Sequence, residues 1–295
     1  MVYSNGWVGR YNREVTVKIR ITTLAENTAE MGYLAEWGLS MFIEADGVKV
    51  LFDTGMGVAA VHNAQLFGID LAMVDKIVIS HGHRDHTGGL REVLVRMKKE
   101  VEVIAHPDIW ASKYTRWRKR KEHYSGLPFR RELLENLGAS FNLTSKPARV
   151  TDRFLTTGEI PMLSDYEEID SGLFDKKTGE MLPDELKDDL ALVIDADYGL
   201  VVILGCAHRG IINTLKQAQQ VTGKKLIYAA IGGTHLLNAS KERWQKTAAD
   251  LKEMGVRYLG VSHCTGFEAS AYLAQEFGDR FFVNNSGSRW TLPFK

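Results

Sequence analysis

The chain has 295 residues, which is enough for one large domain or two small ones with a substantial buried core. Its 37 basic and 37 acidic residues leave no net charge, so no overall field attracts nucleic acid or a membrane surface, and we expect neither as a partner. The two cysteines, Cys206 and Cys264, exclude a disulfide-stapled scaffold and favour a reducing compartment. No apolar run is long enough to span a bilayer, and we expect one cytoplasmic domain over residues 1–295.

The first strands are indicated by alternation and by one turn. Residues 15–21 alternate apolar with polar side chains, the period of a strand with one buried face. The apolar runs at 41–45 and 48–52 are joined by Asp46-Gly47, a strong hairpin signal. The second run ends at Asp53, which by its local pattern is a turn residue. The chain is therefore predicted to open with a sheet.

A strand predicted at residues 73–79 ends in a cluster of metal-ligand side chains. His81 and His83 are two apart in an extended or turning segment, so both rings can hold one cation through neutral nitrogens. Asp85 and His86 follow on the turn and can face a second cation nearby, with a water bridging the two. The stretch predicts a site for one or two divalent ions, with zinc expected first and manganese, iron or magnesium as alternatives.

A helix is predicted at residues 90–97 and a strand at 101–105, before a basic segment. Residues 113–131 carry eight basic side chains and one acidic, interleaved with aromatic rings. We predict a basic helical insertion at about 107–137, a lid that holds a small anionic substrate with Arg116 among its contacts. The composition also fits a solvated helix or a contact surface of a homo-oligomer. No nucleic-acid-binding module is visible in it.

An acidic segment balances the basic one. Residues 165–189 contain ten acidic side chains and three lysines. We expect the two segments to face each other, within one subunit or between subunits.

The second half of the chain repeats the pattern of the first. A hairpin is predicted at 190–195 and 200–204, and it leads to Cys206 and His208 as the earlier hairpin leads to Asp53. We infer an internal pseudo-repeat of two sheet halves. The elements predicted after it are helices at 211–220, 241–254 and 268–276 and strands at 226–231, 258–262 and 281–283.

Each of three successive strand-and-helix units has a histidine just after its strand. His208, His235 and His263 occupy these positions. In layered α/β folds the strand ends lie along one edge of the sheet, where binding sites form. This convergence is a second argument for a metal centre.

The run His81-Gly82-His83-Arg84-Asp85-His86, followed by Thr-Gly-Gly-Leu, resembles the signature of the metallo-β-lactamase superfamily. The resemblance implies an α/β protein with a four-layer αβ/βα sandwich and one or two metals where its halves meet. It also implies that Asp53 supports the ligands through hydrogen bonds, that His263 serves the second metal and that His208 completes the first set.

Cys206 stands where superfamily members often have an aspartate that bridges the metals. A thiolate here could bind zinc, and a small buried residue at a strand end is the alternative, which we prefer. We therefore place Cys206 behind the ligands, in a supporting role like that of Asp53.

The motifs at 205–214, 231–236 and 262–266 resemble a narrower group. It is the group named for 7,8-dihydropterin-6-yl-methyl-4-(β-D-ribofuranosyl)aminobenzene-5′-phosphate synthase, and the likeness runs from Leu39 to Gly287. Trp37 departs from the pattern of that group, which has histidine there. The departure leaves substrate contacts near residue 37 open.

These features predict a metal-dependent hydrolase that acts on a phosphorylated or ester substrate through a metal-activated water. Asp85 would hold the water and accept its proton, and His235 would donate to the leaving group or keep a purely structural role. Thr265 and Arg116 are expected to contact substrate. Alternatives are a transferase that joins a pterin-methyl diphosphate to an aminobenzene ribosyl phosphate, an iron redox protein, and a non-catalytic member that binds metal and ligand.

Overall fold

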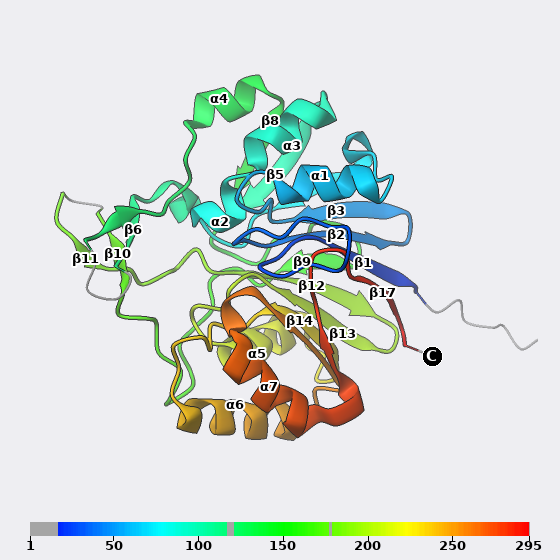
Figure 1. Ribbon diagram of the computed structural model, residues 1–295, viewed down its shortest axis with the longest axis vertical. Coiled ribbons are helices and arrows are strands. Elements are labelled where there is room, and N and C mark those ends of the chain that lie inside the picture. The colour runs from blue at the N-terminus through cyan, green and yellow to red at the C-terminus, as the bar shows by residue number, and fades with distance from the viewer. Residues whose placement is uncertain (1–16, 117–120, 177–178, 295) are drawn as a thin grey trace, which may run out of the picture.

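Two β-sheets lie face to face, and helices cover the outer side of each (Figure 1). The computed structural model describes residues 17–116, 121–176 and 179–294. The strands of the first sheet are, in spatial order, β17 (Arg289–Leu292), β1 (Ile19–Ala25), β2 (Ser40–Ala45), β3 (Val48–Phe52), β4 (Lys76–Val78), β5 (Val101–Ala105) and β8 (Ala139–Leu143). Those of the second are β16 (Phe281–Val283), β15 (Tyr258–Ser262), β14 (Ile227–Gly233), β13 (Gly199–Leu204), β12 (Ala191–Ala196) and β9 (Phe154–Thr156).

The helices form the two outer layers. On the first sheet lie α1 (Ala59–Leu66), α3 (Leu90–Met97) and α4 (Arg131–Asn136), and on the second lie α5 (Ile211–Thr222), α6 (Lys241–Glu253) and α7 (Phe267–Phe277). Short helical turns occur at α2 (Arg84–Thr87), η1 (Leu71–Met73), η2 (Pro107–Trp110), η3 (His263–Thr265) and η4 (Gly278–Arg280). None of the described helices is long and apolar enough to cross a membrane.

Three apolar clusters hold the layers together. The central cluster joins the inner faces of both sheets and includes Ile21 and Phe52 from the first and Ile194 and Ile203 from the second. The other two clusters lie between each sheet and its helices. In α3 the buried residues are those that the helical spacing predicts, Leu90, Val93, Leu94 and Met97. The αβ/βα sandwich expected from the sequence is confirmed.

The expected pseudo-repeat is visible in the strand order. In the first sheet the antiparallel hairpin β2–β3 is followed by the parallel strands β4, β5 and β8. In the second sheet the hairpin β12–β13 is followed by the parallel strands β14, β15 and β16. Because parallel strands end at the same edge of a sheet, both halves place the loops after their strands side by side.

A small third sheet corrects one expectation. Its strands are, in order, β11 (Leu182–Pro183), β10 (Leu173–Asp175), β6 (Lys113–Thr115) and β7 (His123–Tyr124), and it projects at the left of Figure 1. The basic segment is thus mainly a hairpin in its described residues, and helix α4 begins only at Arg131. Residues 117–120 lie outside the described residues, as do 15–16 of the first expected strand. Since β6 pairs with β10, the basic and acidic segments face each other within one chain, as expected.

Candidate metal centre

Three imidazole nitrogens from two loops meet in a triangle. His81 and His83 lie in the loop after β4, and His208 lies in the loop after β13. The Nε2 atom of His81 is 2.9 Å from Nδ1 of His83 and 3.1 Å from Nε2 of His208, and the third side of the triangle is 3.2 Å. All three rings are buried, His83 being the most exposed at 6%.

Hydrogen bonds alone cannot account for this triangle. An imidazole nitrogen is either a donor or an acceptor, so three mutually adjacent nitrogens always include one pair of like kind. A cation at the centre removes the conflict, because all three nitrogens then act as electron-pair donors. Zn–N bonds of about 2.0–2.1 Å would place the nitrogens of a tetrahedral site roughly 3.3 Å apart, close to the spacing found here. The donor set therefore fits a divalent ion.

The electrostatic surroundings keep these three rings neutral. Burial lowers the pKa of His81 and His208 well below the usual value, and it lowers the pKa of His83 to about 3. The neighbouring imidazoles and the ammonium group of Lys113 act in the same direction. A neutral imidazole is the form that binds metal, so the triangle is prepared for an ion without first losing a proton.

A second group of ligand atoms lies beside the first. The Nε2 atom of His86 is 3.2 Å from Nε2 of His263 and 3.1 Å from Sγ of Cys206. A carboxylate oxygen of Asp85, Oδ2, is 3.3 Å from Nε2 of His263. The same oxygen accepts a hydrogen bond of 3.1 Å from Nε1 of Trp37, whose half-exposed ring also contacts that of His263.

Charge within the second group differs from that in the first. Burial acts to raise the pKa of Asp85, but His86 and His263 outweigh it and hold this pKa below the usual range. Burial acts to lower the pKa of His86, yet the carboxylates of Asp53 and Asp85 raise it to about 9. The second position therefore attracts positive charge, which a proton or a metal ion can supply.

The thiol of Cys206 belongs to both groups. Its Sγ atom lies within 4.8 Å of ligand nitrogens of His81 and His208, and within the same distance of those of His86 and His263. The sequence favours a supporting place for Cys206 behind the ligands, whereas in the structure its sulfur lies beside the ligand nitrogens of both groups. Burial raises the pKa of this thiol, so the thiolate needs a cation beside it to form.

Hydrogen bonds orient the histidines of the second group. Asp53 accepts from Nδ1 of His86 at 2.6 Å and from the backbone N–H of Ser80 at 2.7 Å, which is the supporting geometry that the resemblance implies. The side chain of Asn27 lies 2.9 Å from Nδ1 of His263, and Glu26 accepts from the backbone N–H of the same histidine. Asn27 and Glu26 were not anticipated, because no local pattern links a loop after β1 to one after β15.

The backbone is strained where the strands end at this centre. Asp53, Ala207, His235 and His263 each follow a strand of the site, and each has a positive φ, between 50° and 57°. Residues other than glycine adopt this conformation at a cost of about 1 kcal/mol or more, and such strain gathers at functional sites. The repeated turn aims the side chains of both halves at one place.

Three expected site residues lie outside the two ligand groups. The ring of His235 is 4.2 Å from that of His208, partly buried at the edge of the centre, so its catalytic role stays a prediction. Thr265 is fully buried, and its hydroxyl donates to the carbonyl of Ser262. Arg116 directly follows β6 and pairs with Glu122. Substrate contacts of Thr265 and Arg116 stay predictions.

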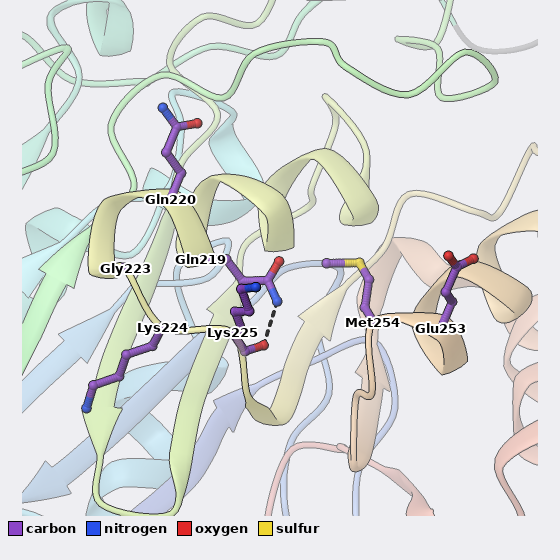
Figure 2. Close-up of a pocket in the computed structure, with 7 residues that line it drawn as sticks. All are labelled: Gln219, Gln220, Gly223, Lys224, Lys225, Glu253 and Met254. Atoms are coloured by element: carbon purple, nitrogen blue, oxygen red, sulfur yellow. Dashed lines mark hydrogen bonds between the residues drawn. The ribbon is translucent and has the colours of Figure 1, made fainter.

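A shallow depression elsewhere on the surface is unrelated to this centre. It lies where α5 ends, about 18 Å along the helix from the loop that carries His208, and Figure 2 shows Gln220 and Lys224 pointing outward from it. The residues that line it are Gln219, Gln220, Gly223, Lys224, Lys225, Glu253 and Met254. It contains no group of metal-ligand side chains.

Residues 38–263 match the family model of the metallo-beta-lactamase superfamily, and the chain belongs to this superfamily. The matched residues include both ligand groups.

Two curated relatives and one solved structure resemble nearly the whole chain. The 7,8-dihydropterin-6-methyl-4-(beta-D-ribofuranosyl)-aminobenzene-5'-phosphate synthase of Methanocaldococcus jannaschii is 33% identical, over 89% of this chain and 93% of that protein. A protein of the same organism described as uncharacterized is 32% identical, over 86% and 94%. The crystal structure of Tm1679, described as a metal-dependent hydrolase of the beta-lactamase superfamily, is 28% identical with a TM-score of 0.80, over 92% and 98%. These likenesses confirm the narrower resemblance and indicate an enzyme.

Proposed function

We propose that this chain is a metal-dependent hydrolase that cleaves a small phosphorylated or ester substrate. The observation that carries the proposal is the pair of ligand groups around Cys206, built from both halves of the sandwich. The ligands would be His81, His83 and His208 for one ion, Asp85, His86 and His263 for the other, and Cys206 for both. Zinc is the first expectation for the metal, and the protein would act in the cytoplasm, where its two free cysteines stay reduced.

The chain's own residues then have defined tasks. Bound divalent metal lowers the pKa of a water and polarises the phosphoryl or carbonyl oxygen. As the oxygen of this water bonds to phosphorus or carbon, Asp85 accepts the proton that the water loses. The N–H of the Trp37 ring holds the Asp85 carboxylate in place. His235, at the edge of the centre, gives a proton to the leaving oxygen as the old bond breaks. Each hydrolysis thus consumes one water and releases an alcohol and an acid.

Transfer is the second candidate, and the M. jannaschii relative supports it. The name of that protein describes synthesis of a dihydropterin joined to a ribofuranosyl-aminobenzene phosphate, and the likeness spans most of both chains. In such a reaction an amine, rather than water, would attack an activated pterin-methyl carbon, and a diphosphate would leave. The same centre would then neutralise the departing diphosphate.

One set of assays separates these candidates. The protein is loaded in turn with zinc, manganese, iron(II) or magnesium and given phosphodiester, phosphomonoester, lactone and thioester substrates in water enriched in oxygen-18. Incorporation of the label into the acid product supports hydrolysis. Formation of a carbon–nitrogen bond from a pterin-methyl diphosphate and an aminobenzene ribosyl phosphate, without activity on the simple esters, would instead select the transferase.

The double variant His81→Ala/His83→Ala supplies the control. We expect it to lose both bound metal and activity, because it lacks two of the three nitrogens of the triangle. Full activity in a metal-free double variant would exclude metal catalysis. Metal binding by the unaltered protein without turnover of any substrate would identify it as a non-catalytic member.

A further inference from the structure

A buried lysine on the third sheet connects that sheet to the centre. The side chain of Lys113, on β6, is 1% exposed, and its Nζ atom lies 2.8 Å from Oδ2 of Asp184 and 2.8 Å from Oδ1 of Asp188. A buried ammonium is costly unless it is fully paired. The two carboxylates overcome the effect of burial and keep the pKa of Lys113 above its usual value, so the lysine is charged.

Asp188 passes this contact to the first ligand loop. Its second oxygen, Oδ2, accepts a hydrogen bond of 2.7 Å from the backbone N–H of Gly82, the residue between His81 and His83. The backbone of Gly82 packs closely against Ile109, because a Cβ atom at residue 82 would lie 2.6 Å from the carbonyl oxygen of Ile109. The turn that carries two of the three nitrogens is thus held between Asp188 and Ile109.

The neighbours of Asp188 hold the remaining parts of the triangle. Asp189 accepts from the backbone N–H of Arg209, directly after His208, at 2.9 Å. The backbone N–H of Leu190 donates to the carbonyl of Ser80, directly before His81, at 3.0 Å. Residues 188–190 therefore contact the backbone beside both ligand loops of the first group.

The second ligand group includes a histidine with supports of its own, since His263 is oriented by Asn27 and Glu26. Asp53 serves both groups, because it orients His86 and also accepts from Oγ of Ser80, which lies 2.9 Å from Nδ1 of His81. The ammonium group of Lys113 donates to Asp184 and Asp188, and neither of these carboxylates contacts the ligands Asp85, His86 or His263. A substitution at Lys113 should therefore change the metal affinity of the first ion position more than that of the second.

We propose that Lys113 is a positioning residue, which acts through Asp188 to fix the turn of His81 and His83 and so sets the affinity of the first ion position separately from the second. The inference rests on the metal centre of the proposed function and does not depend on which reaction the centre catalyses. It also gives the basic segment a structural role, different from that of a lid, because β6 is connected through Lys113 and Asp188 to the ligand loop.

The test compares two variants on opposite sides of the centre. In Lys113→Met the ammonium is lost while most of the side-chain volume is kept, and in Asn27→Leu the partner of His263 is lost. Cobalt(II) and zinc are titrated against a chromophoric chelator, and the visible spectrum of cobalt(II) is recorded at one and two equivalents. We expect Lys113→Met to weaken the first position by about 10- to 100-fold and to alter its cobalt spectrum, with the second position within about threefold. Asn27→Leu should show the reverse.

A milder variant covers the case in which Lys113→Met does not fold, which thermal melting would reveal. Lys113 and Gly82 donate to different oxygens of Asp188, and Asp188→Asn turns one of these oxygens into an NH2 donor, so one of the two bonds is lost and the first position should again weaken selectively. Equal losses at both positions, or affinities like those of the unaltered protein in folded variants, would overturn the inference. If the unaltered protein binds no metal, the proposed function fails as well, whereas selective loss without any enzymatic activity leaves the inference standing.

Discussion

The sulfur of Cys206 lies among the ligand nitrogens of both groups, where many superfamily members have a carboxylate. Thiolate is a softer ligand than carboxylate and favours zinc over magnesium or manganese. The choice of this residue therefore bears on which metal the protein selects. Cys264, the other cysteine, lies nearby, but its Sγ accepts from the backbone N–H of His235 and belongs to neither ligand group.

We expect Cys206→Ser to abolish the sulfur-to-metal charge-transfer absorption of the cobalt(II)-loaded protein, because the oxygen of serine has no equivalent transition. Cys264→Ser is the matched control and should keep the absorption. Ultraviolet and visible spectra of both variants, recorded at equal cobalt content, check this. Loss of the band in the control alone would show that the roles of the two cysteines have been assigned the wrong way round.

Trp37 supports a second prediction for a single residue. Trp37→Phe keeps a ring beside His263 but removes the N–H that bonds to Asp85. A hydrogen bond to a charged group contributes about 1.5 kcal/mol or more, so we expect kcat to fall about tenfold with little change in Tm. Trp290→Phe is the control, since the buried Nε1 of Trp290 has no hydrogen-bond partner among the described residues. An unchanged kcat in Trp37→Phe would mean that the orientation of Asp85 does not depend on this contact.

At the scale of the elements, one carboxylate caps the whole beginning of α1. Glu36, in the connection between β1 and β2, accepts from the backbone N–H groups of residues 56–59, at 2.9, 3.3, 2.9 and 3.1 Å. Helix N-termini leave such groups without partners inside the helix and favour negative charge. The loop that carries Trp37 toward the centre is thereby fastened to a helix.

We expect Glu36→Gln to lower the free energy of unfolding by about 1 kcal/mol, because one amide oxygen replaces two charged oxygens as acceptor. For a chain of this size this corresponds to a fall in Tm of roughly 2 °C. Calorimetry of the variant measures the change, with the exposed Glu132→Gln as control. A fall of the same size in the control would remove the special role of Glu36.

The second half has an equivalent cap, which is formed by a buried carboxyl group. Glu167 accepts from the backbone N–H groups of Ile212 and Asn213 at the start of α5, and burial raises its pKa. Because this pKa is higher in the folded than in the unfolded state, folding favours the protonated carboxyl group. Its contribution to the free energy of unfolding is therefore lost as pH rises above the usual pKa of a glutamate. We therefore expect the stability of Glu167→Gln, relative to that of the unaltered protein, to increase as pH rises above about 4, the usual pKa of a glutamate. Melting curves across this range test the sign of the slope.

The elements show where sequence reasoning succeeds and where it does not. Both hairpins follow from their Asp-Gly and Asp-Tyr-Gly turns, and α3 follows from its spacing, because these signals are local. The strands β6 and β7 are two or three residues long, too short for a period to appear, and β6 pairs with β10 about sixty residues later. A basic and aromatic composition without a period does not reveal strands this short, and the helical prediction is wrong for β6 and β7.

The metal ligands can be predicted from the sequence, but the residues that orient them cannot. His81, His83, Asp85 and His86 are predictable because four ligand-type residues fall within one loop. Their supports, such as Lys113 and Asn27, come from loops whose proximity exists only after folding. The sequence leaves the role of Cys206 open, because it shows which residue follows a strand but not the direction of its side chain.

At the scale of the whole molecule, the two halves repeat more than their strand order. Glu36 caps α1 and Glu167 caps α5, each from the connection that precedes the hairpin of its half. Asn63 in α1 accepts from the backbone of Leu34, and Asn213 in α5 accepts from that of Leu163, so an asparagine also fastens each connection. The centre lies between the halves and draws ligands from both.

Removal of metal should therefore loosen the joint between the halves. An ion bound only by the folded protein stabilises it by about 4 kcal/mol when free metal is a thousandfold above Kd. We expect chelation to lower Tm by several degrees, and restoration of zinc to reverse the change. The His81→Ala/His83→Ala variant should respond much less to chelation. Identical melting of chelated and zinc-loaded protein would contradict a structural contribution of the metal.

The last described strand has a consequence for how the chain is made. β17 borders β1 in the first sheet, and the side chains of Thr23 and Asn284, 261 positions apart, share a hydrogen bond beside it. During synthesis β1 leaves the ribosome long before β17, so its backbone edge is open to pairing with the wrong partner in the meantime. Such distant contacts also slow folding. We therefore expect the nascent N-terminal half to depend on chaperones more than the complete chain does.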